Sequence, residues 1–135
     1  MSETLSELLD AARSSDFRVR VGAATALAQY DGPDVRAALI ALLRDPADTA
    51  PIQAAADALV ARRDGFGTAV ICEAIGGAGD QDDDAIDHLL TFVAWAAERN
   101  EYAIYALAVE ALHSDDPLVR AGAAELLPSD QRPSA

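Results

Sequence analysis

The sequence predicts an all-α fold, an α-α superhelix of about four stacked helix pairs, and three observations lead to it. First, the twelve residues from Asp16 (D-F-R-V-R-V-G-A-A-T-A-L) match those from Asp116 (D-P-L-V-R-A-G-A-A-E-L-L) at seven positions. Second, weaker copies begin at Asp48 and Asp82, so the four starts lie 32, 34 and 34 residues apart. Third, apolar residues recur at helical spacing, and no segment shows the sustained alternation of a strand.

Composition agrees with closely packed helices. The chain of 135 residues is 51% hydrophobic, contains 31 Ala and has only 5% aromatic residues. Alanine has the highest helix propensity and lets helix backbones approach one another. The length fits one domain with a sizeable core, and the apolar residues recur too evenly for disorder despite the net charge of -13.

The first four helices are expected at 2–14, 16–30, 33–44 and 48–62. The first and third have apolar faces at helical spacing, made by Leu5, Leu8, Leu9 and Ala12, and by Ala38, Leu39, Leu42 and Leu43. Asp31-Gly32-Pro33 separates the second helix from the third, and Asp45-Pro46 separates the third from the fourth.

The last four helices are expected at 66–76, 82–98, 100–113 and 116–127. Arg63-Asp64-Gly65 precedes the fifth, Gly76-Gly77-Ala78-Gly79 ends it, and Pro117 occupies a first-turn position of the eighth. Residues 1–128 therefore form one repeat domain, and 129–135 are expected to be a frayed tail.

Small residues on the second helix of each repeat are expected to let neighbouring helices approach closely. They are Gly22, Ala23, Ala26, Ala54, Ala55, Ala58, Gly122 and Ala123, with Leu27, Leu59 and Leu127 filling the seam. Cys72 stands alone among apolar neighbours, which indicates a core residue and leaves no internal disulfide.

Two segments resemble a known repeat signature. Val19-Arg20-x-x-Ala23-Ala24-x-Ala26-Leu27 and Val119-Arg120-x-x-Ala123-Ala124-x-Leu126-Leu127 are similar to the second-helix pattern of HEAT repeats, V-R-x-x-A-A-x-A-L. The resemblance implies an α-solenoid whose second helices line a concave face that binds another macromolecule. The signatures of ankyrin and tetratricopeptide repeats, which share the period, are absent.

Charge limits the choice of partner. A chain with net charge -13 repels phosphate backbones, so nucleic acid is not an expected ligand, whereas a basic protein would be attracted. All ten basic residues are Arg, which is typical of a GC-rich bacterium. The first residues lack a signal peptide's features and no run could span a membrane, so we expect a cytoplasmic protein.

The candidate partner-binding residues lie on the second helices. Aligning the repeats makes Thr25, Asp57, Thr91 and Glu125 equivalent, and these would form a polar row on the concave face. In the third repeat, Asp84, Asp87, His88, Thr91 and Trp95 face away from the apolar side of the helix. Tryptophan is enriched at binding hot spots, so Trp95 is the strongest candidate. The alternative is that Trp95 packs between repeats.

Five aspartates, at positions 80, 82, 83, 84 and 87, form the densest charge cluster. They could cap the sixth helix, where carboxylates oppose the helix dipole, or form a docking patch for a basic partner. A calcium loop is not expected because the D-x-D-x-D-G spacing is missing.

The sequence therefore predicts a non-enzymatic, protein-binding scaffold that needs no cofactor and no metal. Two alternatives stay open: an immunity or antitoxin protein that masks a basic toxin, and a HEAT-like lyase or other enzyme using the groove around His88. The ends of a short array also allow self-association.

Overall fold

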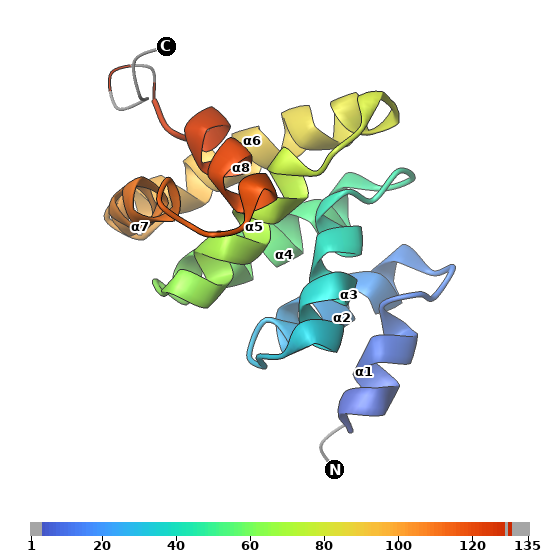
Figure 1. Ribbon diagram of the computed structural model, residues 1–135. Helices are drawn as coiled ribbons and strands as arrows, with labels where there is room; N and C mark the ends of the chain where they lie inside the picture. The colour runs from blue at the N-terminus through green and yellow to red at the C-terminus, as the bar shows by residue number, and fades with distance from the viewer. Residues whose placement is uncertain (1–3, 129, 131–135) are drawn as a thin grey trace.

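The computed structural model describes residues 4–128 and 130, and all regular structure in them is helical, as predicted (Figure 1). The α-helices are α1 (Leu5–Ala11), α2 (Phe17–Leu27), α3 (Pro33–Leu43), α4 (Thr49–Ala61), α5 (Gly65–Gly76), α6 (Asp83–Arg99), α7 (Ala103–Ala111) and α8 (Pro117–Leu126), with a 3-10 turn η1 (Asp80–Asp82) before α6. Each matches one predicted helix. None of the described helices is long and apolar enough to cross a membrane. Apart from Asp130, the predicted tail 129–135 lies outside the described residues.

Several of the residues predicted to mark helix ends lie at the start of a helix. Asp16 and Asp116 cap α2 and α8, each accepting a hydrogen bond of 2.9 Å from the backbone amide two residues further on. Pro117 occupies the first turn of α8, where a missing amide proton costs no helical hydrogen bond. Gly32, with φ of 115°, makes the turn into α3 in a conformation that favours glycine.

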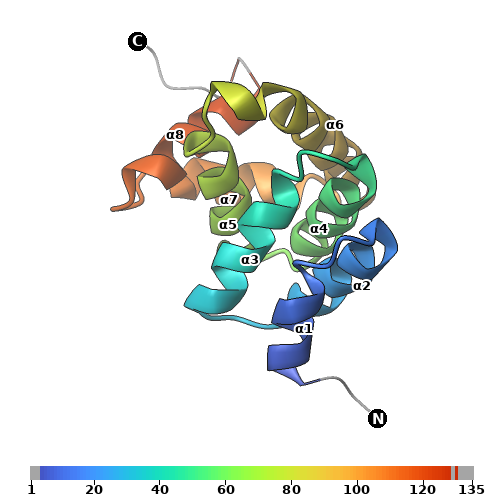
Figure 2. The same ribbon diagram turned by 90° about the vertical axis from the view of Figure 1, so that its right-hand side faces the viewer.

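The first four helices form a regular double layer. α1 pairs with α2, and α3 pairs with α4. Along the array α2 packs on α4 and α4 on α6, so these three helices lie side by side in one layer (Figure 2). α3 and α5 pack together in the other layer.

Arg20, from the Val-Arg motif, connects the first repeat to the second. Its guanidinium donates to Asp45 at 2.8 Å, to Asp48 at 2.7 Å and to the carbonyl oxygen of Ser14 at 2.9 Å. The Asp45 side chain is only 5% exposed and also accepts hydrogen bonds from the amides of Ala47 and Asp48. A buried ion pair with every acceptor satisfied fixes the spacing of these two repeats.

Two other arginines connect helix ends across repeats. Arg62 donates to the carbonyl oxygens of Ala28 at 2.9 Å and Tyr30 at 3.0 Å, just beyond α2. Arg44 donates to those of Ala74 at 2.8 Å and Glu73 at 3.1 Å, near the end of α5. Carbonyl groups at helix ends often lack helical partners, and these side chains supply hydrogen bonds there, while the Glu73 carbonyl also accepts one from the amide of Gly77.

The regular pattern ends after α5. α5 and α6 are consecutive, yet they make at most marginal contact, and so do α6 and α8. Instead α8 packs on α5 more extensively than any other two helices pack together, and α7 lies against both (Figure 1). The approach is very close: a Cβ atom on Gly122 would collide with the carbonyl oxygen of Cys72, and one on Gly76 with that of Leu118. α8 thus takes the place beside α5 that a regular array would give to α6.

The buried residues include most of the predicted core, and one predicted packing residue is exposed instead. Leu27, Leu59 and Leu127 are fully buried, as is Cys72, whose pKa rises to about 12 because burial disfavours the thiolate. Gly122 is buried as expected. The prediction for Gly22 was wrong: it is exposed, and a Cβ there would meet nothing within 4 Å, because no helix packs on that side of α2.

Candidate functional site

The layer formed by α2, α4 and α6 presents an exposed outer face, here called the second-helix face. Thr25, Asp57 and Thr91 occupy equivalent positions on these three adjacent helices. Both threonines are exposed, and their hydroxyls donate to carbonyl oxygens one turn earlier, those of Val21 at 3.3 Å and Asp87 at 3.1 Å.

Glu125 does not continue this row. Its helix α8 packs on α5 and makes at most marginal contact with α6. Glu125 instead lines a hollow at the other edge of α6, together with Asp87. The alignment of repeats could not show this, because α8 repeats the sequence of α2 without repeating its neighbours.

Asp57 is engaged within the chain. Its carboxylate accepts a hydrogen bond of 2.8 Å from Arg99, which connects α4 to α6 across the second-helix face. Burial raises the pKa of Asp57, although the charge and hydrogen bond of Arg99 act in the opposite direction. A partner that used Asp57 would have to compete with Arg99.

Three aromatic rings follow one another along α6. His88 stacks on Phe92 with ring centroids 6.2 Å apart, and Phe92 meets Trp95 edge to face at 5.7 Å. Trp95 is 52% exposed, so the alternative that it fills a gap between repeats is wrong. Phe92 was not among the predicted residues, although its spacing of four from His88 and three from Trp95 places all three on adjoining turns. Large exposed rings on a helix surface are typical of binding anchors.

A hollow of about 260 Å³ lies beside the histidine end of this aromatic run. It is formed between the segment that connects α3 to α4 and the first turns of α6. Charged and polar groups of both signs line it, namely Arg44, Asp45, Asp48, Thr49, Gln81, Asp84 and His88. This mixed lining suits a polar side chain of a partner better than an apolar ligand.

The aspartate cluster serves the backbone at one point and faces solvent elsewhere. Asp82 accepts a hydrogen bond of 3.0 Å from the amide of Gly79, and Asp83 and Asp84 stand in the first turn of α6. Asp80, Asp83 and Asp87 line the second hollow, of about 270 Å³, together with Glu125. The helix-cap and acidic-patch hypotheses are therefore compatible. Within residues 4–128 and 130, no group of three or more His, Cys, Asp or Glu could hold a metal ion.

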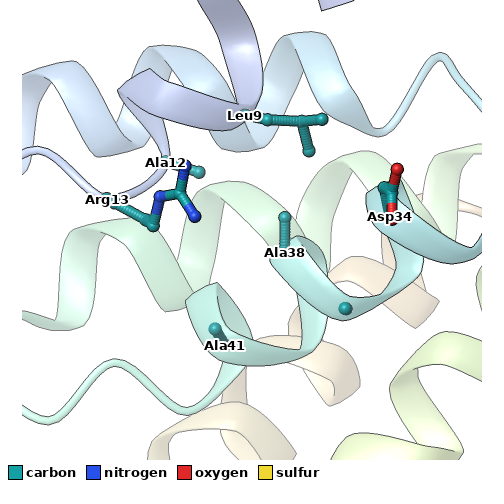
Figure 3. Close-up of a pocket in the computed structure, with 7 residues that line it drawn as sticks. Leu9, Ala12, Arg13, Asp34, Ala38 and Ala41 are labelled. Atoms are coloured by element: carbon teal, nitrogen blue, oxygen red, sulfur yellow. The ribbon is translucent and has the colours of Figure 1, made fainter. Parts of the chain in front are cut away.

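A third hollow lies at the opposite end of the array, on the face away from α6. It is a groove of about 370 Å³ between α1 and α3, lined mainly by apolar groups (Figure 3). Leu9, Ala12, Ala38 and Ala41 form its sides, with Arg13 and Asp34 along its rim. It contains none of the predicted site residues.

Comparison with known proteins matches the N-terminal part of the chain. A family model described as HEAT repeats matches residues 1–60, which end within α4. No curated protein and no solved structure matches the chain. The matched part is the regular double layer with the Arg20 connection, and the helices after it continue the all-helical architecture. Residues 1–60 of the chain are therefore similar to HEAT repeats.

Proposed function

We propose that this chain is a protein-interaction module that binds a macromolecular partner on the second-helix face, with the aromatic run of α6 as its anchor. HEAT repeats generally act as scaffolds for protein interaction. The observation that carries the proposal is the 52% exposure of Trp95 at the end of a run of three adjoining rings, because tryptophan is enriched among the residues that dominate binding energy at interfaces. The predicted residues Thr25, Asp84, Asp87, His88 and Thr91 surround this anchor or extend the same face.

Charge favours a basic protein as the partner. Asp84, Asp87 and Glu98 are exposed on α6 around the aromatic run, and the chain as a whole has net charge -13. A partner with Arg side chains could pair with these carboxylates and stack a guanidinium on the indole of Trp95. Nucleic acid is disfavoured on the same electrostatic grounds.

Site-specific photocrosslinking tests the location of this surface. A photoreactive amino acid is placed at Thr91, beside Trp95, and as a matched control at Ala106, which is exposed on α7. Crosslinks to a partner are expected from position 91 and not from position 106. Equal crosslinking from both positions would contradict the assignment of the second-helix face.

A binding titration with the captured partner then tests the anchor. Because Trp95 is the sole tryptophan, its emission should shift to shorter wavelength as the partner excludes water. Trp95→Ala should weaken binding by about 2 kcal/mol or more, the usual size for a hot spot. Unchanged affinity of a folded Trp95→Ala variant would sink the proposal.

The acidic hollow favours one narrower version of this function, an immunity or antitoxin protein that masks a basic toxin. Asp80, Asp83 and Asp87 gather with Glu125 around that hollow, where they would attract an Arg or Lys side chain. In this version the association rate should fall steeply with added salt. A partner whose association rate is independent of salt would exclude it.

A further inference from the structure

We infer that a hollow between the second and third helix pairs is a binding site for an arginine side chain of the partner protein. This hollow, here called the inter-repeat hollow, is the one of about 260 Å³ between the segment that connects α3 to α4 and the first turns of α6. The inference rests on the proposed function and deepens it, because the hollow adjoins the aromatic run of the second-helix face. A comparison of two junctions in the array carries it.

At the junction between α2 and α4, an arginine of the chain itself closes the space. The side chain of Arg20, in the first turn of α2, is only 11% exposed. Its Nε donates to Asp45 at 2.8 Å, one Nη donates to Asp48 at 2.7 Å, and the other Nη donates to the carbonyl oxygen of Ser14 at 2.9 Å. These acceptors precede α2 and α4 in the chain. One planar cation, with its donors spread over three acceptors, therefore joins the two helices.

The junction between α4 and α6 lacks this arginine. With the repeats aligned, Ile52 of α4 stands where Arg20 stands on α2, and it lines the inter-repeat hollow. Its side chain is 1% exposed and has no hydrogen-bond donor. The other walls are formed by the segment before α4 and by the start of α6, as the surroundings of Arg20 are formed by the segments before α2 and α4. The place that Arg20 fills at one junction is thus open at the next.

The inter-repeat hollow contains acceptors for a guanidinium group. Asp84 is exposed, and among residues 4–128 and 130 no arginine forms an ion pair with it. Asp48 binds Arg20 through Oδ2, which leaves Oδ1 for a second donor. The hydroxyl of Thr49 and the amide oxygen of Gln81 belong to the same lining. These groups can accept the several hydrogen bonds that one guanidinium donates.

The charges around the hollow favour a single cation. Three carboxylates line it, those of Asp45, Asp48 and Asp84. Two guanidinium groups balance them in part, since Arg20 binds the first two and Arg44 also lines the hollow. With His88 neutral, one negative charge is left over. One arginine side chain would neutralise it, whereas a carboxylate or a phosphate group would be repelled.

The size of the hollow indicates one side chain rather than a small-molecule ligand. Its volume of about 260 Å³ lies below the range of about 300–1,000 Å³ that is typical of small-molecule pockets. The imidazole of His88 borders it, and guanidinium groups stack on aromatic rings. Trp95 lies seven residues further along α6, which is about 10 Å. A partner would therefore present its arginine at roughly this distance from the group that covers Trp95.

A titration of the whole purified chain with N-acetyl-arginine amide tests the site without the partner. Proton–nitrogen correlation NMR follows the backbone amides, and those of Thr49 and Asp84 should shift and saturate. N-acetyl-citrulline amide has the same shape without the charge and should bind about tenfold more weakly. N-acetyl-lysine amide has the charge without the planar fork and should bind about threefold more weakly.

Two variants of equal net charge test the position of the site. Asp84→Asn removes a carboxylate of the inter-repeat hollow and should weaken the binding of N-acetyl-arginine amide by about tenfold. Asp87→Asn makes the same change of charge on α6, but Asp87 lines the other hollow, so this matched control should bind as wild type does. Both side chains are exposed, so both variants should fold, which circular dichroism checks.

Three results would overturn the arginine site. They are amide signals that do not respond to N-acetyl-arginine amide, equal binding of the citrulline or lysine compound, and equal weakening by the two variants. None of them touches the anchor at Trp95, which is measured by the titration with the partner. Failure of the arginine site and failure of the proposed function are therefore distinguishable.

Discussion

α2 and α8 share seven of twelve residues from their capping aspartates onward, yet the sides that they bury overlap only in part, at Ala23 and Leu27 and their counterparts Ala123 and Leu127. Val19 is 43% exposed in α2, whereas Val119 is 2% exposed in α8. Arg20 is held between carboxylates, whereas Arg120 faces solvent. The shared residues determine the helix and its cap, and the neighbouring helices determine which side of it becomes core.

The different neighbours have a physical cause. α2 and its C-cap carry Ala24 and Ala28, both fully buried. α6 has Leu90 at the position equivalent to Ala24, and a larger side chain holds a neighbouring helix further away. α5 instead carries Thr68, Cys72 and Gly76 at intervals of four, and a Cβ on the last of these would collide with the backbone of α8. Small residues on both helices allow the closest packing, so α8 docks on α5.

The largest expected difference between the surroundings of α8 and those of α2 is in thiol reactivity. Cys72 lies under α8, is fully buried and has a pKa raised to about 12 by burial. Its reaction with an aromatic disulfide reagent at neutral pH should be more than about a thousandfold slower in the folded chain than in urea, because the helices must separate first.

The matched control places a thiol on α2, which carries the other copy of the repeated sequence. Gly22→Cys, in a chain with Cys72→Ala, should react nearly as fast folded as unfolded, since this position is open. Rapid labelling of Cys72 in the native protein would show that α8 does not stay docked.

The next largest effect separates the two arginines. Arg20→Ala should lower the free energy of unfolding by about 3 kcal/mol, because it leaves the Asp45 carboxylate buried without its cation. Arg120→Ala should change it by less than about 0.5 kcal/mol, as is usual for an exposed position. Urea denaturation of both variants measures the difference, and equal losses would mean that Arg20 does not connect the repeats.

A smaller effect separates the two valines. Val119→Ala removes two buried carbon groups between α8 and its neighbours, so we expect a loss of about 1.5 kcal/mol. Val19→Ala should be neutral within about 0.5 kcal/mol in the monomer. The comparison is made at low protein concentration, and a loss at Val19 equal to that at Val119 would show that α2 is covered.

The eight helices could be predicted from the sequence because their signals are local. Glycine, proline and capping aspartates mark the ends, and apolar spacing marks the faces, so Asp16, Gly32 and Pro117 stand where expected. The docking of α8 on α5 could not be predicted from the sequence, because it depends on residues far apart in the chain. The small residues of α5, read together with Gly122, were the available signal.

The candidate site divides in the same way. Thr25, Asp57 and Thr91 could be aligned because α2, α4 and α6 stack regularly. Glu125 could not be placed, since its helix has changed neighbours, and Arg99 was not foreseen as the partner of Asp57 because their contact spans 42 residues. The exposure of Trp95 required the structure, because helical spacing alone fits either a buried or an exposed ring.

The most direct measurement adds one methyl group at equivalent glycines of α2 and α8. Gly22→Ala and Gly122→Ala are compared by urea denaturation of dilute protein. Gly22→Ala should raise the free energy of unfolding by about 1 kcal/mol, because alanine is the better helix former and its methyl meets open space. Gly122→Ala should lower it by about 2 kcal/mol, since the methyl collides with the Cys72 carbonyl of α5. Changes of the same sign at both positions would contradict the account that one motif faces solvent and the other forms the closest contact of the core.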